Sequence, residues 1–283
     1  MATQAVLDRP TKSPPPTVAT GGRAPRTGAR RMLSKVPEVT LWFWIIKILA
    51  TTVGETAADY LNTNLNLGLT NTTYIMGVLL AAVLTAQFSL RRYVPGVYWT
   101  AVVLISVVGT LITDNLTDNF NVPLPTSTIG FGIALALTFA AWFASERTLS
   151  IHSIHTRRRE VFYWLTILFT FALGTAAGDL VAEHLNLGFA LSALAFAGVI
   201  AAVTVAHLRF GLNAILAFWA AYILTRPLGA SVGDLVSQPT SAGGLGLGTT
   251  VTSLIFLTAI LGTVVYLTKS RRDQITTPDA PQG

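Results

Sequence analysis

Eight stretches of this sequence are apolar over a length that can cross a lipid bilayer as a helix. A helix needs about 20 apolar residues to cross about 30 Å of hydrocarbon. The chain is 52% hydrophobic and only 11% charged, whereas about a quarter of the residues are charged in a soluble domain. We therefore predict an all-α, polytopic membrane protein with eight transmembrane helices. The predicted spans are 39–61, 73–90, 96–117, 128–145, 161–182, 189–208, 212–236 and 248–268.

The two ends of the chain differ from these spans. Residues 1–37 hold seven Lys or Arg, one acid and no apolar run, so we predict a disordered basic tail. An Arg-rich organellar targeting segment is the alternative interpretation. The chain has no cysteine, which excludes disulfides, thiolate metal sites and thiol catalysis. The predicted divisions are the tail, a first transmembrane half at 38–147, a cytoplasmic linker at 148–160, a second half at 161–269 and a second cytoplasmic tail at 270–283.

The basic residues indicate the orientation of the helices. Of the 19 Lys and Arg, all but Lys47 and Arg226 lie in the amino-terminal tail, at the ends of even-numbered spans, or in the connection after the fourth span. Because positive charge marks the cytoplasmic side, we predict a multi-pass protein of the cell membrane with both termini cytoplasmic. The formal charge of +6 then favours anionic lipid headgroups, and not nucleic acid, as partners.

The sequence is internally repeated. A shift of 120 residues without a gap places Asp59 on Asp179 and Asp114 on Asp234. Within each half the two Asp residues are 55 residues apart, and each follows a Gly by five positions. That Gly lies about 140° round the helix from the Asp, which favours close helix packing over a hinge. The chain therefore reads as four tandem hairpins of one orientation, with parallel pseudo-symmetry about the membrane normal and the four Asp residues at one depth toward the outer side.

Four copies of a Gly-to-Asp helix hairpin, in a chain of this size, resemble a family of small prokaryotic membrane proteins. That family is built from a repeat of unknown function, and its members are described as uncharacterised membrane-anchored proteins. The resemblance covers Val39 to Lys269 and rests on "GETAAD", "GTLITD", "GTAAGD" and "GASVGD". It implies a prokaryotic, multi-pass protein. The second copy departs from the pattern with "NVPLP" in place of an Asn-Leu-Gly turn, and the fourth has a longer loop, "SAGGLGLGT".

The repeat Asp residues have two interpretations. One places them at the outer interface, where an ionised carboxylate ends a helix and is solvated at little cost. The other rests on three further acids that lie one helical turn from a repeat Asp, with Arg226 the only cation within helical reach. Such carboxylates repel one another unless protons or metal ions neutralise them. We therefore predict a cation-binding ring of Asp59, Asp114, Asp179 and Asp234, which are also the predicted metal ligands, extended by Glu55, Asp118 and Glu183.

The available ligands limit the identity of the ion. Carboxylates, the side chains of Asn62, Asn64 and Asn66, and backbone carbonyls are hard donors, so manganese, magnesium, calcium and protons all fit and copper(I) does not. His184 favours manganese slightly, and an ordinary loop role for it is an equal alternative. The two His of "HSIH" (152–155) lie in a basic loop, where two ligands make a poor metal site.

Two basic residues lie inside predicted spans. Arg226 precedes Pro227, two helical turns before Asp234, and we predict that it is an internal counter-ion to a repeat Asp or a gate. The alternative is a side chain that snorkels at a kink. Lys47 lies close after Trp44, and we predict that it snorkels to the cytoplasmic face.

The pattern as a whole predicts membrane transport of a cation, foremost a divalent metal ion such as manganese. The alternatives are a proton-coupled transporter of a small organic cation and a non-transporting scaffold or sensor. We expect no enzyme and no cofactor, since "AAGD" and "SVGD" lack the first Gly of intramembrane aspartyl proteases and neither an HExxH motif nor a phosphate-binding loop occurs. "GGLGLG" (243–248) is predicted to be a flexible connection. Expected partners are membrane lipids and the cation, and the sequence leaves a homo-oligomer open.

Overall fold

The computed structural model describes residues 35–65 and 67–273. Within these residues the chain forms eight long α-helices and no β-strand. All eight are long and apolar enough to cross a membrane, so the prediction of an all-α, eight-span membrane protein is confirmed. The helices are α1 (Leu41–Asp59), α2 (Leu69–Ser89), α3 (Pro95–Asp114), α4 (Leu124–Glu146), α5 (Arg157–Asp179), α6 (Phe189–Phe210), α7 (Ala214–Ser237) and α8 (Thr249–Ser270).

Three helices begin earlier than their apolar stretches. α2, α4 and α5 each start four residues before the predicted span, because polar or charged residues form their first turn. At α5 the Thr156 side chain accepts a hydrogen bond of 3.3 Å from the backbone N–H of Arg159, which caps the helix start. A search for apolar stretches does not detect such turns, because their side chains are polar. Their backbone groups are satisfied by capping and by water.

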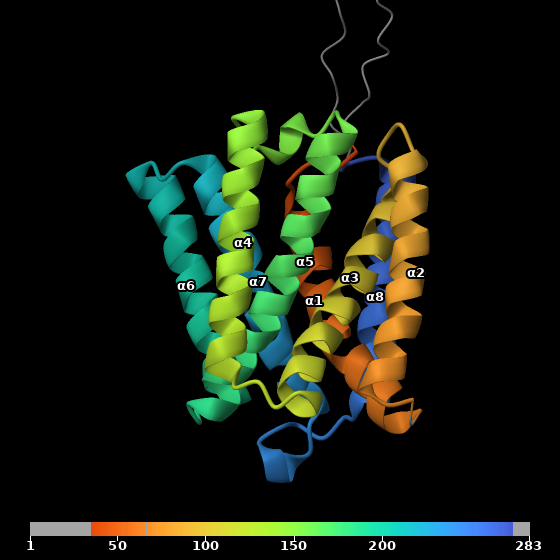
Figure 1. The fold of residues 1–283 in the computed structure, drawn as a ribbon, viewed down its shortest axis with the longest axis vertical. Coiled ribbons are helices and arrows are strands. Elements are labelled where there is room, and N and C mark those ends of the chain that lie inside the picture. The colour runs from red at the N-terminus through yellow and green to blue at the C-terminus, as the bar shows by residue number, and fades with distance from the viewer. Residues whose placement is uncertain (1–34, 66, 274–283) are drawn as a thin grey trace, which may run out of the picture. The chain divides into compact units, whose positions relative to one another are not determined.

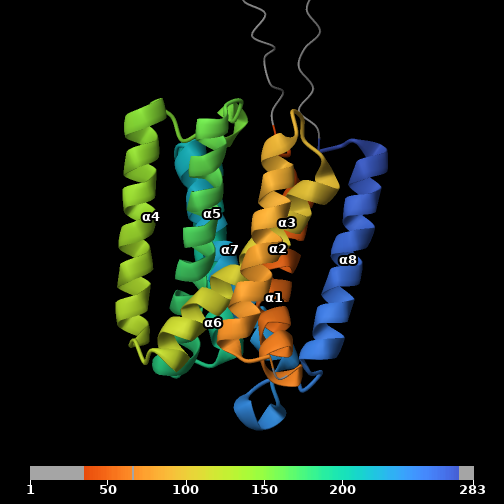
Figure 2. The same ribbon diagram turned by 45° about the vertical axis from the view of Figure 1, so that its right-hand side comes forward.

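Four helices form an inner ring and four lie outside it (Figures 1 and 2). Around the ring α1 packs on α3, α3 on α5, α5 on α7, and α7 on α1. The outer helices α2, α4 and α6 pack on the inner helix that follows each of them, and α8 packs on α1. Over an 18-residue apolar stretch of each helix, 50 to 67% of the residues are buried in the inner helices, against 11 to 28% in the outer helices. Each hairpin thus contributes one inner and one outer helix.

The repeat Gly residues lie where neighbouring inner helices cross. A Cβ atom at Gly229 would overlap the Thr51 side chain of α1, and each of the other three repeat Gly residues likewise meets the next helix of the ring. The packing interpretation of these residues is therefore confirmed. The remaining pairs are Gly54 with Ser106, Gly109 with Phe171, and Gly174 with Arg226.

Three inner helices widen directly after their repeat Asp. α1, α3 and α5 end at Asp59, Asp114 and Asp179, and each continues into a five-residue π-helical turn. Such turns are rare and are frequent at functional sites. α7 instead runs on from Asp234 to Ser237 without one. The turns are Tyr60–Asn64, Asn115–Asn119 and Leu180–His184.

The Gly-rich loop after α7 folds back on the end of that helix. The N–H groups of residues 245–248 donate hydrogen bonds of 2.7 to 3.1 Å to the carbonyls of residues 235–238. These are carbonyls that a helix end leaves without partners. The loop turns at Gly243, Gly246 and Gly248, whose φ angles of 87°, 76° and 78° suit glycine. The loop is therefore an ordered cap and not the loose connection that its composition predicts.

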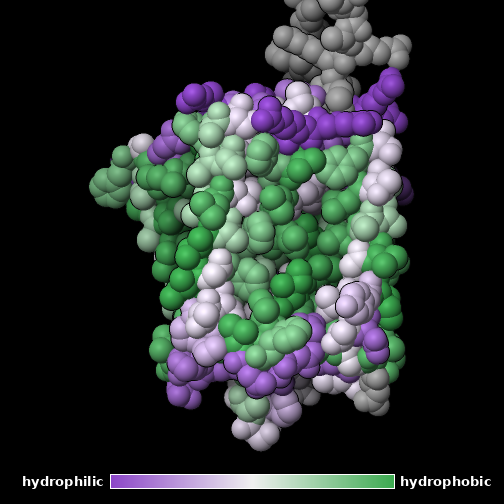
Figure 3. Space-filling model, in the orientation of Figure 1, coloured by the Kyte–Doolittle hydropathy of each residue, from purple (hydrophilic) through white to green (hydrophobic). Residues whose placement is uncertain are grey.

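The helices define two opposite faces of the bundle. The inner helices begin at the basic face, where Arg91, Arg147 and Arg157 lie, and end at the acidic face, where Asp59 and Asp179 lie. Figure 3 shows a hydrophobic band between two hydrophilic rims. This band matches a hydrocarbon layer, and the exposed apolar side chains of the outer helices contribute to it, among them Leu79, Ile133, Leu194 and Leu261.

Residues near both ends of the described chain close the basic face. Lys35 forms an ion pair of 2.7 Å with Glu160 of α5, and both side chains are buried. Tyr93 donates a hydrogen bond of 2.5 Å to Asp273, and burial together with that carboxylate raises the pKa of the Tyr93 phenol. Lys35, which falls in the predicted disordered tail, therefore has a defined place in the fold. The rest of the two predicted tails, 1–34 and 274–283, lies outside the described residues.

Candidate cation site

The four repeat Asp residues lie at the acidic ends of the inner helices. Asp59, Asp114 and Asp179 are the last residues of α1, α3 and α5 and are half-buried. Asp234 lies three residues before the end of α7 and is only 7% exposed. An acid that merely ends a helix at the interface would be solvated, so that interpretation does not hold for Asp234.

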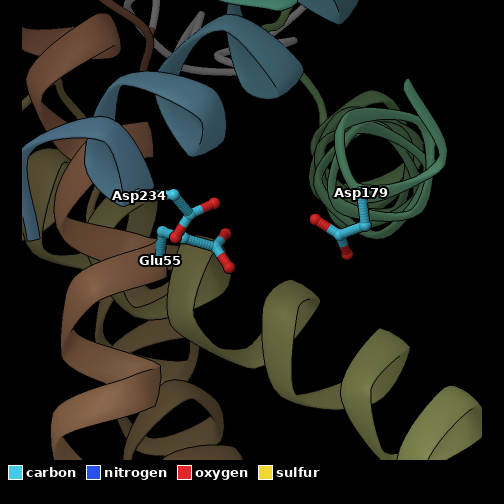
Figure 4. A group of neighbouring side chains, drawn as sticks. All are labelled: Glu55, Asp179 and Asp234. Atoms are coloured by element: carbon cyan, nitrogen blue, oxygen red, sulfur yellow. The ribbon is translucent and has the colours of Figure 1, made fainter. Parts of the chain in front are cut away.

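Three carboxylates from three inner helices converge in this region. Glu55 of α1, Asp179 of α5 and Asp234 of α7 each have a carboxylate oxygen within 4.8 Å of the other two. In Figure 4, Asp179 points from α5 toward Glu55 and Asp234 on the opposite side. Oxygens that bind one divalent ion at about 2.1 to 2.6 Å lie at most about 5 Å apart, so the spacing suits a shared cation. Glu55, Asp179 and Asp234 are called the acid cluster below.

Asp179 and Asp234 differ from Glu55 in their contacts within the described part of the chain. Among the described residues, no hydrogen bond or ion pair reaches the carboxylate of Asp179 or Asp234. Burying an ionised carboxylate without a partner is strongly unfavourable. Protons or a bound cation at the acid cluster would offset this cost.

Arg226 lies on the side of the acid cluster that faces the basic face. Its side chain is 0% exposed, and its Nη2 donates a hydrogen bond of 2.9 Å to the Glu55 carboxylate and bonds to the hydroxyls of Thr110 and Thr175. Its Nη1 donates a bond of 3.0 Å to the Thr51 carbonyl. Full burial contradicts the snorkelling alternative. The ion pair is made with Glu55, and no described repeat Asp forms one with this guanidinium.

The remaining predicted acids lie around the acid cluster. Asp59 accepts a hydrogen bond of 3.4 Å from Gln238, which follows α7. Asp114, at the end of α3, is not part of the converging group. Asp118 and Glu183 lie in the π-helical turns and are exposed. Negative charge therefore extends from the exposed turns at the acidic face down to buried Glu55.

The neutral candidate ligands do not join the acid cluster. His184 is exposed in the turn after α5, and its nitrogens are not part of the converging group. Asn64 accepts a hydrogen bond of 3.2 Å from Thr249, and Asn62 is half-buried. Asn66 lies outside the described residues. The donor set that the structure brings together is therefore made of carboxylates.

Lys47 is placed differently from its prediction. Its side chain does not reach the basic face: the residue is 1% exposed, and its Nζ has no hydrogen-bond partner among the described residues. The amine instead lies over the rings of Phe171 and Tyr222, at 4.3 Å from each ring centroid. The snorkelling prediction was wrong because it considered distance along one helix, whereas α5 and α7 cover this face of α1.

Sequence reasoning missed several residues of this region. Thr110 and Thr175, which bind Arg226, follow the repeat Gly of α3 and α5 directly, as Glu55 follows that of α1. Phe171 stands three residues before its repeat Gly, as Arg226 does in α7. Alignment of all four copies on their Gly residues would have grouped these positions, because equivalent residues of a ring share one level.

Comparison with protein families agrees with the internal repeat. The family described as Repeat of Unknown Function (DUF347) matches four successive segments, residues 42–93, 97–148, 162–212 and 217–273. Each segment contains one inner and one outer helix of the structure. No curated protein and no solved structure matches the chain. The chain therefore belongs to the family built from this repeat of unknown function, as four tandem copies.

Proposed function

We propose that the protein transports a small cation across the membrane and that the acid cluster is its binding site. One observation carries the proposal: three carboxylates from separate inner helices, two buried and one half-buried, have oxygens within 4.8 Å of one another, and two of the three have no partners among the described residues. Intramembrane acids at a helix interface are rare and usually functional. The exposed acids Asp118 and Glu183 would raise the local concentration of cations at the entrance.

The chemistry of the donors favours a hard divalent ion. Carboxylate oxygens suit manganese, magnesium and calcium, and they bind soft ions poorly. Manganese is our first candidate, with magnesium and calcium as its competitors. Because His184 stays outside the acid cluster, the donors that meet there suit these three ions alike, and competition between the ions must decide among them.

Arg226 gives the site a gate. Its guanidinium already neutralises Glu55, so an entering divalent ion competes with it for the same carboxylate. Toward the basic face the ring is filled by buried aromatic side chains, including Tyr98, Tyr163 and Tyr222. In the proposed cycle, this conformation is the one in which the site is open to the acidic face. Release of the cation at the basic face then requires Arg226 and these aromatic rings to move.

The proposed setting is the cell membrane, with the basic face in the cytoplasm. Described Arg residues gather at that face, in the connections between hairpins, as the positive-inside rule requires. Anionic lipid headgroups are the proposed partners of these residues. The acidic face then meets the exterior.

Equilibrium binding of manganese tests the proposal directly. Bound Mn²⁺ loses the sharp electron paramagnetic resonance signal of the hydrated ion, so titration of the purified protein yields an affinity. We expect Asp179→Asn to weaken binding at least tenfold, about 1.4 kcal/mol, because a charged ligand becomes neutral. Glu38→Gln, an exposed acid-to-amide change at the basic face, is the matched control and should bind as the native protein does.

Each outcome of the titration decides between functions. Displacement of manganese by excess magnesium or calcium would name the preferred ion. Displacement by tetramethylammonium alone would favour the organic-cation alternative. No binding by the native protein, or unchanged binding by Asp179→Asn, would refute the cation site and favour a scaffold or sensor.

A further inference from the structure

Lys47 occupies a position at which the other three copies of the repeat have an uncharged residue. Aligned on the repeat Gly, its equivalents in the other three copies are Val102, Ile167 and Tyr222. Lys47 shares one face of α1 with Thr51 and Glu55, at successive intervals of four residues. α1 thus has a lysine on its interior face, two helical turns from Glu55 toward the basic face.

The surroundings of the Lys47 amine hold its charge weakly. The faces of Phe171 and Tyr222, each 4.3 Å away, favour the ammonium form through cation–π attraction. The amine is completely buried and has no hydrogen-bond acceptor among the described residues, and the Arg226 guanidinium lies over the same Phe171 ring. Two titratable or charged groups of α7 adjoin this amine: Tyr222, whose ring it contacts, and Arg226, which lies over the same Phe171 ring. The other buried titratable groups on the helices around it are Tyr98 on α3, Tyr163 on α5 and Glu55 on α1 itself.

Arg226 connects this amine to the acid cluster. The Arg226 guanidinium carbon lies 5.8 Å from the centroid of the Phe171 ring, which is also one of the two rings that contact Lys47. At its other end the guanidinium holds the Glu55 carboxylate at 2.9 Å. When a cation takes Glu55, the guanidinium loses its counter-charge, and the positive charge near Lys47 is no longer offset.

We propose that Lys47 is the coupling residue of the transporter: it releases a proton when a cation binds the acid cluster and regains the proton when the cation leaves. In this step one N–H bond of the ammonium breaks, the nitrogen keeps the electron pair, and the proton leaves to water at the acidic face, from which the cation enters. The amine takes a proton from the basic face when the cation leaves there. The inference rests on the proposed function and adds proton exchange to it. Lys47 acts through Arg226 and does not touch the cation.

Proteoliposomes that contain a trapped manganese indicator and a trapped pH indicator test the coupling. We expect the native protein to move manganese one way and protons the other way. Lys47→Arg should still bind manganese but transport it at least tenfold more slowly, because an arginine cannot release its proton. Lys47→Met should carry manganese without proton counter-movement. Lys269→Met, a change of an exposed lysine in the last turn of α8, should behave as the native protein does.

The outcomes separate this inference from the proposed function. Manganese transport without proton movement in the native protein would overturn the role of Lys47 and leave the cation pathway intact. Native-like coupling in Lys47→Arg or in Lys47→Met would also overturn it, since the carboxylates would then supply the protons. No manganese movement by the native protein would overturn both. If Lys47→Met does not elute from gel filtration as a folded protein, Lys47→Gln takes its place in the experiment.

Discussion

At the scale of single residues, the buried pair of Arg226 and Glu55 is difficult to explain by stability. Both residues are at most 6% exposed, and desolvating two charges costs about as much as their attraction returns. The equivalents of Glu55 in the other copies are Thr110, Thr175 and Ala230, so the fold tolerates neutral side chains at this level. The pair is therefore better explained by the membership of Glu55 in the acid cluster.

Removing one partner of this pair should destabilise the protein more than removing both. Arg226→Met leaves Glu55 buried among further acids, and we expect a loss of about 3–5 kcal/mol in the free energy of unfolding. The double variant with Glu55→Gln should recover most of that loss. Chemical unfolding of the detergent-solubilised protein, followed by tryptophan fluorescence, measures the free energy of unfolding of the native protein, the single variant and the double variant.

A second measurement belongs to the same pair. Manganese should raise the stability of Arg226→Met more than that of the native protein, because the ion supplies the missing positive charge to Glu55. Additive effects of the two substitutions would contradict the ion pair, and an equal response to manganese would contradict its link to the acid cluster.

At the scale of helices, the inner ring depends on small residues at its crossings. Gly229→Ala places a methyl group against the Thr51 side chain and backbone of α1, and we expect a loss of about 1–3 kcal/mol. Gly198 of outer helix α6 has no atom within 4 Å of an added Cβ, so Gly198→Ala should leave stability unchanged or raise it slightly.

Thermal unfolding in detergent measures both glycine variants under one set of conditions. A melting temperature that falls for Gly229→Ala and not for Gly198→Ala supports the ring contacts. Equal effects at the two sites would contradict them, since helix propensity alone would then account for both.

The sequence predicts helix positions better than it predicts what lies inside the ring. Eight spans, the hairpin repeat and the packing role of Gly54 follow from length, periodicity and residue size, which act locally. The π-helical turns after Asp59, Asp114 and Asp179 were not predicted, because a change of helical pitch leaves no trace in hydropathy. The starts of α2, α4 and α5 were missed for a similar reason. Their first turns are polar, and a search for apolar stretches passes over polar residues.

The candidate site shows the same limit. That acids gather at the acidic ends of the inner helices could be predicted from spacing, but which of them meet could not. Glu55, Asp179 and Asp234 converge because α1, α5 and α7 bring them together, and their positions along each helix do not specify that contact. Lys47 was misplaced because its surroundings come from α5 and α7.

At the scale of the whole molecule, orientation decides which side of the membrane the acid cluster serves. The chain has no cysteine, so single cysteines report topology without a background signal. Ser241→Cys, exposed in the loop after α7, should react with a membrane-impermeant maleimide on intact cells. Ser89→Cys, exposed at the basic face, should react only after permeabilisation. The reverse pattern would contradict a cytoplasmic basic face.

The most direct test of the whole account is manganese flux into proteoliposomes, compared between the native protein and Asp234→Asn. Asp234 is a buried carboxylate of the acid cluster with no described partner, so its loss should remove charge from the site without breaking an ion pair. We expect native flux that saturates with manganese concentration and falls at least tenfold in Asp234→Asn, with Glu38→Gln unchanged. Equal flux in the native protein and a folded Asp234→Asn variant would contradict a cation pathway through the acid cluster.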